Sequence, residues 1–166
     1  EMKFKLANYT TFVNIWNVKE LKDIQISSNQ CGKKTLEIGC NMTLSDLIDN
    51  MKRLIKQNEN NGNNSLFEAF LANLKYFASR QIRNFATLSG NIITGSPISD
   101  LNPILMANNA ILVLLSESHG LRSIPIRNFY LGYRKMDLKA DEVLIKVILD
   151  LPENNLEIVK AYKQSK

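Results

Sequence analysis

The spacing of apolar positions changes along the chain, and each change predicts a different kind of element. Before residue 40, apolar and polar residues alternate over short runs such as 12–15 and 24–26, which is typical of β-strands. From Thr43 the spacing becomes helical, and Asp46 lies three residues later, as in a capping box. The apolar residues that share one face of this predicted helix are Leu44, Leu47, Ile48, Met51, Leu54 and Ile55.

A second helix is predicted after the asparagine-rich stretch 58–64. We expect that stretch to be a mobile loop, because it has almost nothing to bury. Ser65 and Glu68 have the spacing of a second capping box, and we expect the helix to end near Arg83. Its apolar positions, which should face a core, are Phe67, Phe70, Leu71, Leu74, Phe77 and Ala78.

A short helix and a hairpin are predicted further along the chain. Pro103 is expected to start a helix over 104–107. Residues 110–115 are a continuous apolar run, which is typical of a buried strand. A turn over 116–120 and returning residues at 121–124 complete the predicted hairpin.

Alternation predicts two last strands, over 142–149 and 158–162. Strands combined with separate helices place the chain in the α+β class. A length of 166 residues is that of a single domain, which we assign to 1–166.

The stretch 82–103 has the composition of a ligand-holding loop. It is polar, is flanked by apolar periodic segments, and carries Asp100 as its one carboxylate. Small hydroxyls, exposed backbone and one acceptor suit a large polar cofactor with phosphates and hydroxyl groups. The alternative is a serine-rich surface loop that binds nothing. The glycines and hydroxyl residues of the loop are Gly90, Gly95, Thr87, Ser89, Thr94, Ser96 and Ser99.

Composition and charge narrow the classes of function. The net charge of +5 comes from basic residues spread along the chain, which is not the pattern of a nucleic-acid-binding protein. No apolar run reaches the ~20 residues that a membrane span needs. Cys31 and Cys40 are too few to staple a secreted domain, so we expect free thiols and a cytoplasmic protein. With His119 as the single histidine, we expect no metal site.

Several motifs in sequence order resemble the FAD-binding domain of the molybdenum hydroxylases, specifically of xanthine dehydrogenase/oxidase. The resemblance begins with Phe77-Ala78 and continues through residues 82–84, 86–92 and 96–103. Three further pieces follow in the family's order, at 132–135, 141–144 and 161–164, so it covers most of 36–166. The family implies an FAD-binding domain of the molybdopterin dehydrogenase (PCMH/vanillyl-alcohol oxidase-like) type, with a mixed sheet and packed helices.

The resemblance also implies roles around the flavin. Phe77 would pack against the isoalloxazine face, and Ala78 would lie close enough to require a small side chain. Thr87, Gly90 and Asn91 would hold the pyrophosphate or ribityl region. From the residues alone, Phe77 is equally a core aromatic, and the loop side chains are equally caps of their own loop. No catalytic side chain is expected, because a flavin performs its own redox chemistry.

Four more positions match the family pattern. Asp100 would accept a hydrogen bond from a ribose or ribityl hydroxyl or from the ring N–H, or else it caps the turn that follows. Leu144 would line the flavin pocket, although in an alternating strand it is equally a core residue. Lys163 would lie near N1 and the C2 carbonyl of the flavin. Tyr133 would lie on the nicotinamide side, which implies NAD as electron acceptor.

The family further implies a larger enzyme. Its glycine-rich flavin loop corresponds to residues before Glu1, so we expect 1–166 to be roughly the C-terminal two-thirds of the FAD domain. The intact enzyme would add two 2Fe-2S clusters, a molybdopterin domain and NAD, and would form a homodimer in the cytoplasm, with the peroxisome as an alternative. It would oxidise hypoxanthine and xanthine, with electrons passing through FAD to NAD or oxygen. The rival interpretations are an aldehyde oxidase flavin domain that uses oxygen, and a non-catalytic interaction module that has lost FAD.

Overall fold

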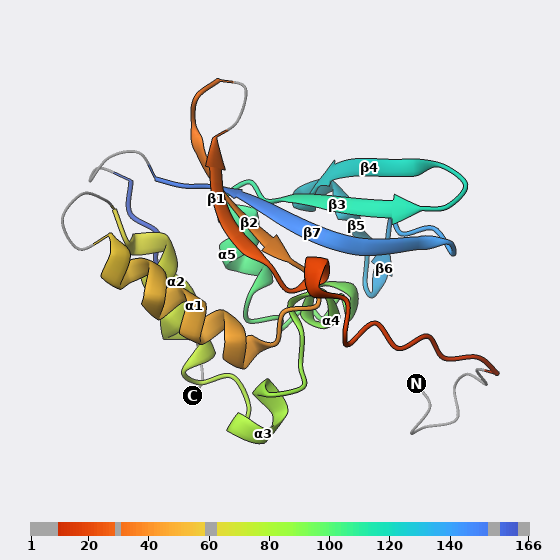
Figure 1. Ribbon diagram of the computed structural model, residues 1–166, viewed down its shortest axis with the longest axis horizontal. Helices are drawn as coiled ribbons and strands as arrows, with labels where there is room; N and C mark the ends of the chain where they lie inside the picture. Colours follow the sequence, from red (N-terminus) through yellow and green to blue (C-terminus); the bar gives the residue numbers. More distant parts are fainter. Residues whose placement is uncertain (1–9, 29–30, 59–62, 153–156, 163–166) are drawn as a thin grey trace.

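A five-stranded sheet forms the centre of the protein, in the order β1-β2-β7-β3-β4 (Figure 1). The structure is a computed structural model that describes residues 10–28, 31–58, 63–152 and 157–162. All four pairings in this sheet are antiparallel. The strands are β1 (Ile24–Ser28), β2 (Lys34–Gly39), β3 (Ile111–Ser116), β4 (Gly120–Pro125) and β7 (Glu142–Asp150).

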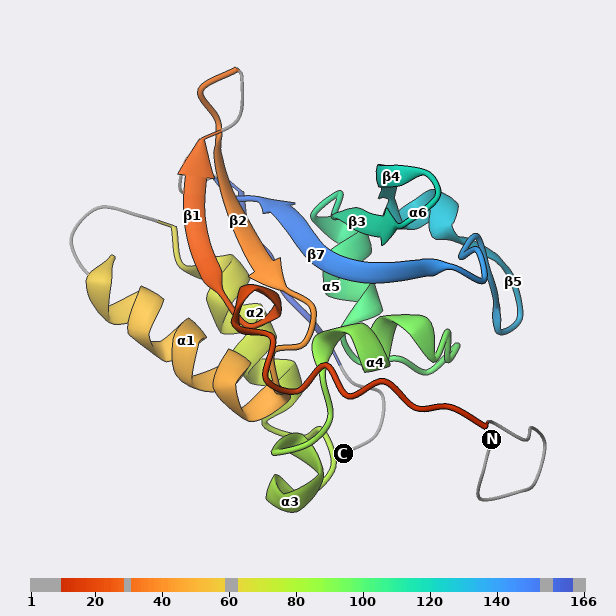
Figure 2. The same ribbon diagram turned by 45° about the vertical axis from the view of Figure 1, so that its right-hand side comes forward.

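The main helices gather on one side of the sheet, and the hydrophobic core fills the space between the two layers (Figure 1, Figure 2). The two longest are α1 (Leu44–Gln57) and α2 (Ser65–Leu74), which pack against each other. The largest fully buried core side chains are Phe67, Phe70 and Phe129. The shorter elements are the 3-10 turn η2 (Lys19–Leu21), α3 (Arg80–Arg83), α4 (Leu88–Ile93), α5 (Asn102–Ala107), α6 (Ile126–Phe129), and the small hairpin of β5 (Tyr130–Gly132) and β6 (Lys135–Met136).

The helix predicted after Thr43 is confirmed as α1. Thr43 is its N-cap, and its Oγ1 accepts a hydrogen bond of 3.0 Å from the backbone N–H of Asp46. The predicted apolar face is turned to the core: Leu44, Leu47, Met51 and Leu54 are buried, and Ile48 and Ile55 are partly buried.

The strand predicted over 12–15 is wrong, whereas the one begun at 24–26 is confirmed as β1. Residues 12–15 carry no regular structure and lie on the surface. The side-chain oxygen of Asn14 accepts a hydrogen bond of 2.8 Å from the backbone N–H of Trp16. Such a local bond offers the backbone an alternative to a sheet ladder, which explains the difference.

The prediction of a second capping box at Ser65 and Glu68 is also wrong. Asn64, not Ser65, is the N-cap of α2, and it makes no capping hydrogen bond through its side chain. The Ser65 hydroxyl instead donates a bond of 3.4 Å to the backbone carbonyl of Glu157. Of the stretch 58–64, for which a mobile loop was predicted, residues 59–62 lie outside the described part of the chain.

The predicted single helix through to Arg83 is divided in two. Helix α2 ends at Leu74, and α3 begins only at Arg80. Between them, the backbone N–H of Phe77 donates to the carbonyl of Leu74 over 3.2 Å, and Ala78 has a φ of +43°. A residue with that φ cannot continue a right-handed helix, so the apolar spacing alone overextends the prediction.

The helix at Pro103 and the following hairpin are confirmed as α5, β3 and β4, with Ser116 opposite Gly120 at the turn. The continuous burial expected of β3 is wrong. Leu112 and Leu114 are buried, but Leu115 is 43% exposed. In an antiparallel sheet covered by helices on one face, successive side chains alternate between core and surface, even in a fully apolar run.

Strand β7 confirms the prediction over 142–149, but residues 158–162 form no strand. Val159 and Ala161 pack on the core, and Ile158 and Tyr162 are exposed. The side chains therefore alternate between core and surface although the segment is not a strand.

The α+β class is confirmed. The expected mixed sheet would contain at least one parallel pair of strands. All strand pairs among the described residues are antiparallel. In the same residues, no helix is long and apolar enough to cross a membrane.

Candidate functional site

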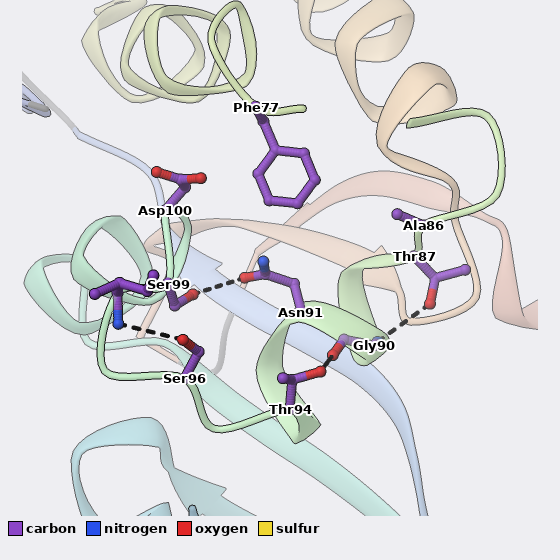
Figure 3. Close-up of a pocket in the computed structure, with 10 residues that line it drawn as sticks. Phe77, Ala86, Thr87, Gly90, Asn91, Thr94, Ser96, Ser99 and Asp100 are labelled. Carbon is purple, nitrogen blue, oxygen red and sulfur yellow. Dashed lines mark hydrogen bonds between the residues drawn. The ribbon is translucent and has the colours of Figure 1, made fainter. Parts of the chain in front are cut away.

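One cavity of about 470 Å³ brings together five of the predicted site residues, Phe77, Thr87, Gly90, Asn91 and Asp100 (Figure 3). Its walls come from the turn after α2, from α4, and from the connection between α4 and α5. Volumes of this order are typical of small-molecule sites. The remaining residues that line the cavity are Ala86, Thr94, Ser96, Ile98 and Ser99.

The predicted loop 82–103 is partly helical around this cavity. It contains the end of α3, all of α4 and the start of α5. Helix α4 forms because Thr87 is its N-cap, and the Thr87 hydroxyl oxygen accepts a bond of 3.1 Å from the backbone N–H of Gly90. Leu88 and Ile92, four residues apart, are fully buried beneath it. The short polar segments between these helices therefore supply the cavity wall.

The start of α4 is tied to the connection between β2 and α1. The backbone carbonyl of Ala86 accepts a bond of 2.8 Å from Leu44, and Thr87 forms an isolated β-bridge with Thr43. Ser89 donates its backbone N–H to the carbonyl of Cys40 over 2.9 Å. These bonds fix one side of the cavity to the sheet and to the N-terminus of α1.

The opposite side is held by side chains. The Ser99 hydroxyl donates a bond of 2.8 Å to Oδ1 of Asn91, which joins the α4–α5 connection to α4 (Figure 3). Asn73, which is 4% exposed on α2, donates a bond of 2.6 Å to the backbone carbonyl of Asp100. Sequence reasoning missed Asn73 as a site residue. The available signal was an asparagine within the apolar face of a predicted helix.

Phe77 closes the cavity at the end of α2. The side chain is partly buried and packs against the core, and its ring projects into the space that Asp100 and Asn91 border (Figure 3). Gly90 lies in α4, where an added Cβ would be 3.2 Å from the Thr87 hydroxyl oxygen. Gly95 has a φ of +58°, and an added Cβ would lie 3.0 Å from the sulfur of Met136. The chain at Gly95 is thus restricted both by conformation and by space.

Four predicted positions lie elsewhere. Ala78 adjoins Phe77 and is exposed, but it is not among the residues that line the cavity. Leu144 is 2% exposed in the core, where it lies opposite Leu114. Tyr133 is 76% exposed and lines a second cavity of about 490 Å³, which shares Ser96 and Ser99 with the first. Lys163 lies outside the described residues.

The groups with perturbed acidity lie away from the main cavity. Burial raises the pKa of the Cys40 thiol, so the thiolate that a nucleophile requires is disfavoured. Burial also raises the pKa of Tyr130, in the wall of the second cavity, to about 12; its hydroxyl donates a bond of 3.0 Å to the carbonyl of Ile92. Within the described chain, no group of three or more His, Cys, Asp or Glu side chains could hold a metal ion.

The donor set of the cavity suits a flat, polar ligand. An aromatic ring lies on one side, and hydroxyls, an amide and a carboxylate lie on the other. Such a set can stack with a ring system and exchange hydrogen bonds with its substituents, but it contains no activated nucleophile. The chemistry would have to come from the ligand itself.

Comparisons with known proteins agree with this geometry. A family model described as "FAD binding domain in molybdopterin dehydrogenase" matches residues 1–152. A xanthine dehydrogenase of Blastobotrys adeninivorans is 42% identical over all of this chain, and one of Oryza sativa subsp. japonica is 39% identical over 99% of it. A nicotinate hydroxylase of Emericella nidulans is 38% identical over all of the chain. The chain spans about 12% of the length of each of these relatives.

Solved structures show the same fold. A cyanide-inactivated copper- and molybdenum-containing CO dehydrogenase aligns over 91% of this chain and 47% of its own, with a TM-score of 0.75 and 21% identity. Quinoline 2-oxidoreductase from Pseudomonas putida 86 aligns over 90% of this chain and 47% of its own, with a TM-score of 0.70 and 23% identity. At these identities the likeness concerns the fold.

Proposed function

The chain belongs to the family of FAD-binding domains of molybdopterin dehydrogenases, and from this premise we propose that its main cavity binds the flavin of FAD. The observation that carries the proposal is the convergence on one cavity of side chains from separate segments of the chain, namely Phe77, Thr87, Gly90, Asn91 and Asp100. When bound, FAD supplies redox chemistry at its isoalloxazine ring.

The residues of the cavity bind and orient the cofactor. Phe77 packs against a face of the ring system, a contact that contributes about 0.5 to 1.5 kcal/mol beyond burial. Ala78 keeps the neighbouring position small. Thr87, Gly90 and Asn91 provide hydroxyl, backbone and amide groups for the pyrophosphate or ribityl part. The Ser99 hydroxyl, through its bond to Oδ1 of Asn91, leaves the Asn91 amide N–H groups available as donors.

Asp100 accepts a hydrogen bond from a hydroxyl or from the ring N–H of the cofactor. Asn73 holds its backbone, so the carboxylate stays at the cavity edge. Leu144 supports the site from the core, and Lys163 is proposed to face the N1 and C2 carbonyl side, where a positive charge stabilises a reduced flavin. Tyr133, beside the second cavity, is proposed to contact the nicotinamide of NAD.

We propose that the chain is the flavin portion of a larger oxidoreductase. In that enzyme, electrons from hypoxanthine or xanthine pass through iron-sulfur clusters to FAD and then to NAD or oxygen. The proposal is supported by the small share of the curated xanthine dehydrogenases that the chain spans. A nicotinate hydroxylase is 38% identical to this chain, so similar flavin portions occur in relatives that are named for different substrates.

The experiment is anaerobic reduction of the intact enzyme. Xanthine, nicotinate or an aldehyde is added, flavin absorbance near 450 nm is followed, and NAD or oxygen is then supplied. Bleaching by xanthine with reoxidation by NAD is the expected result. Bleaching only by an aldehyde, with reoxidation by oxygen alone, would identify the aldehyde oxidase type. A protein without flavin would contradict the proposal.

A further inference from the structure

The turn that carries Phe77 is closed by one side chain. Nη1 of Arg83, on α3, donates hydrogen bonds to the backbone carbonyls of Phe77, at 2.6 Å, and of Ala78, at 2.9 Å. Neither carbonyl accepts a backbone hydrogen bond from the described residues. A guanidinium that binds two otherwise unpaired carbonyls fixes both peptide groups, because charged donors form the stronger hydrogen bonds.

The same turn contains an unfavourable backbone conformation. Ala78 has a φ of +43°, in the left-handed region that residues with a Cβ rarely adopt. Such a conformation persists only where surrounding contacts determine it. The two bonds from Arg83 lie on either side of the Ala78 Cα, since one is to the carbonyl before it and the other to its own. They are therefore placed to hold this conformation.

Arg83 lies within the segment that joins two walls of the cavity. Helix α3 is short, and the backbone N–H of Arg83 donates back to the carbonyl of Ser79 over 3.0 Å, while that of Ala86 donates to Ile82 over 2.8 Å. Ala86 lines the cavity, as does Phe77. The segment from Phe77 to Ala86 thus begins and ends at the cavity, and the Arg83 side chain binds back to the first two residues of this segment.

We propose that Arg83 is a positioning residue for the flavin: it holds the Phe77–Ala78 turn so that the Phe77 ring stays against the cofactor. This inference rests on the proposed function. Arg83 does not itself line the cavity, so its effect on FAD is transmitted through Phe77. If Arg83 served only the stability of the fold, the effect of its removal on the affinity for FAD would not depend on the presence of Phe77.

The test uses the intact enzyme and compares R83A and R83K with R80A. Arg80 lies on the same helix and is exposed, and its side chain makes no hydrogen bond to the described residues. We expect R83A to raise the Kd for FAD about tenfold and to change the visible circular dichroism of the bound flavin. R83K, which keeps a charged donor, should recover most of the affinity, and R80A should match the wild type.

The decisive comparison is made in the F77A background. Because Arg83 acts through Phe77, adding R83A to F77A should raise the Kd less than about twofold further. A full tenfold rise in that background, or an unchanged Kd and dichroism in R83A alone, would overturn the inference while FAD binding by the wild type stands. If R83A does not fold, R83Q takes its place with the same two comparisons. A wild-type enzyme without flavin would overturn the proposed function itself.

Discussion

The side-chain amide of Asn73 donates a hydrogen bond of 2.6 Å to the backbone carbonyl of Asp100, across 27 residues of sequence. Asn73 is buried near the end of α2, and Phe77 follows in the turn after the same helix. One helix therefore positions both the aromatic side of the cavity and the carboxylate at its edge. Mutations on the buried face of α2 should for this reason affect cofactor binding as well as stability.

Asn73→Ala should lower the free energy of unfolding by about 1 to 3 kcal/mol, because it leaves the Asp100 carbonyl without its buried donor. It should also weaken FAD binding. Urea unfolding and FAD titration measure the two effects. Glu68→Ala, an exposed change on the same helix, is the matched control and should stay within about 0.5 kcal/mol of wild type. Unchanged stability in Asn73→Ala would contradict this role.

Thr87→Val should lower stability by about 1 kcal/mol, since it removes the hydroxyl that caps α4 at the Gly90 N–H. The affinity for FAD should fall as well, because Gly90 and Asn91 lie in the first turns of that helix. Thr87→Ser keeps the hydroxyl and should retain both properties. Equal affinity of the valine and serine variants for FAD would contradict a role for the Thr87 hydroxyl at the site.

Acid stability should depend on Glu142. Its carboxylate receives a bidentate pair of bonds from Arg122, at 2.7 and 2.8 Å, and this pairing lowers its pKa from 4.5 to about 2. A carboxyl whose pKa is lower in the folded state stabilises the fold above pH 4.5, and this contribution is lost as the pH falls from 4.5 toward 2.

Glu142→Gln should therefore cost about 2 kcal/mol at pH 6 and much less near pH 2. Unfolding by urea at several pH values measures the difference. The variant keeps part of the acid sensitivity, because hydrogen bonds from Ser116 and Ser118 likewise lower the pKa of Asp141 to about 2. A cost that is constant across this range would show that ionisation of Glu142 is not involved.

Tyr133→Phe should leave the FAD content unchanged and lower the rate of NAD reduction by the intact enzyme. The side chain is exposed beside the second cavity and does not line the first. Steady-state rates with NAD and with oxygen as acceptors separate the two effects. Equal rates with NAD in both proteins would remove Tyr133 from the acceptor site.

The sequence was sufficient to predict the elements whose ends are fixed by neighbouring residues. Thr43 and Asp46 define the start of α1 because a side-chain cap needs only neighbouring residues. The end of α2 was not predictable in the same way. Ala78, in the turn between α2 and α3, adopts a left-handed conformation, and its carbonyl accepts a hydrogen bond from the Arg83 side chain; apolar spacing reports neither feature. The surface segment 12–15 forms no strand despite its alternation, because alternation does not reveal whether a partner strand is present.

The resemblance to the FAD-binding family predicted more of the candidate site than composition did. Composition indicated that 82–103 binds a polar ligand, but it did not reveal that α4 forms within this stretch or that Phe77 faces it. An asparagine within the apolar face of a helix signals a buried polar contact at position 73, but the partner, the Asp100 carbonyl, lies 27 residues away in the sequence. Long-range hydrogen bonds of this kind are determined by tertiary packing, which the chain's periodicity does not encode.

The most direct test of the flavin site is the FAD content and visible spectrum of the purified intact enzyme, measured for the wild type, Phe77→Ala and Asp100→Ala. We expect stoichiometric flavin in the purified wild type and a much lower flavin content in both variants, with folding checked by far-ultraviolet circular dichroism. On titration, Phe77→Ala should still bind FAD, with a higher Kd. Full flavin retained in both variants would contradict the site. A folded but colourless wild type would contradict FAD binding and favour a non-catalytic module.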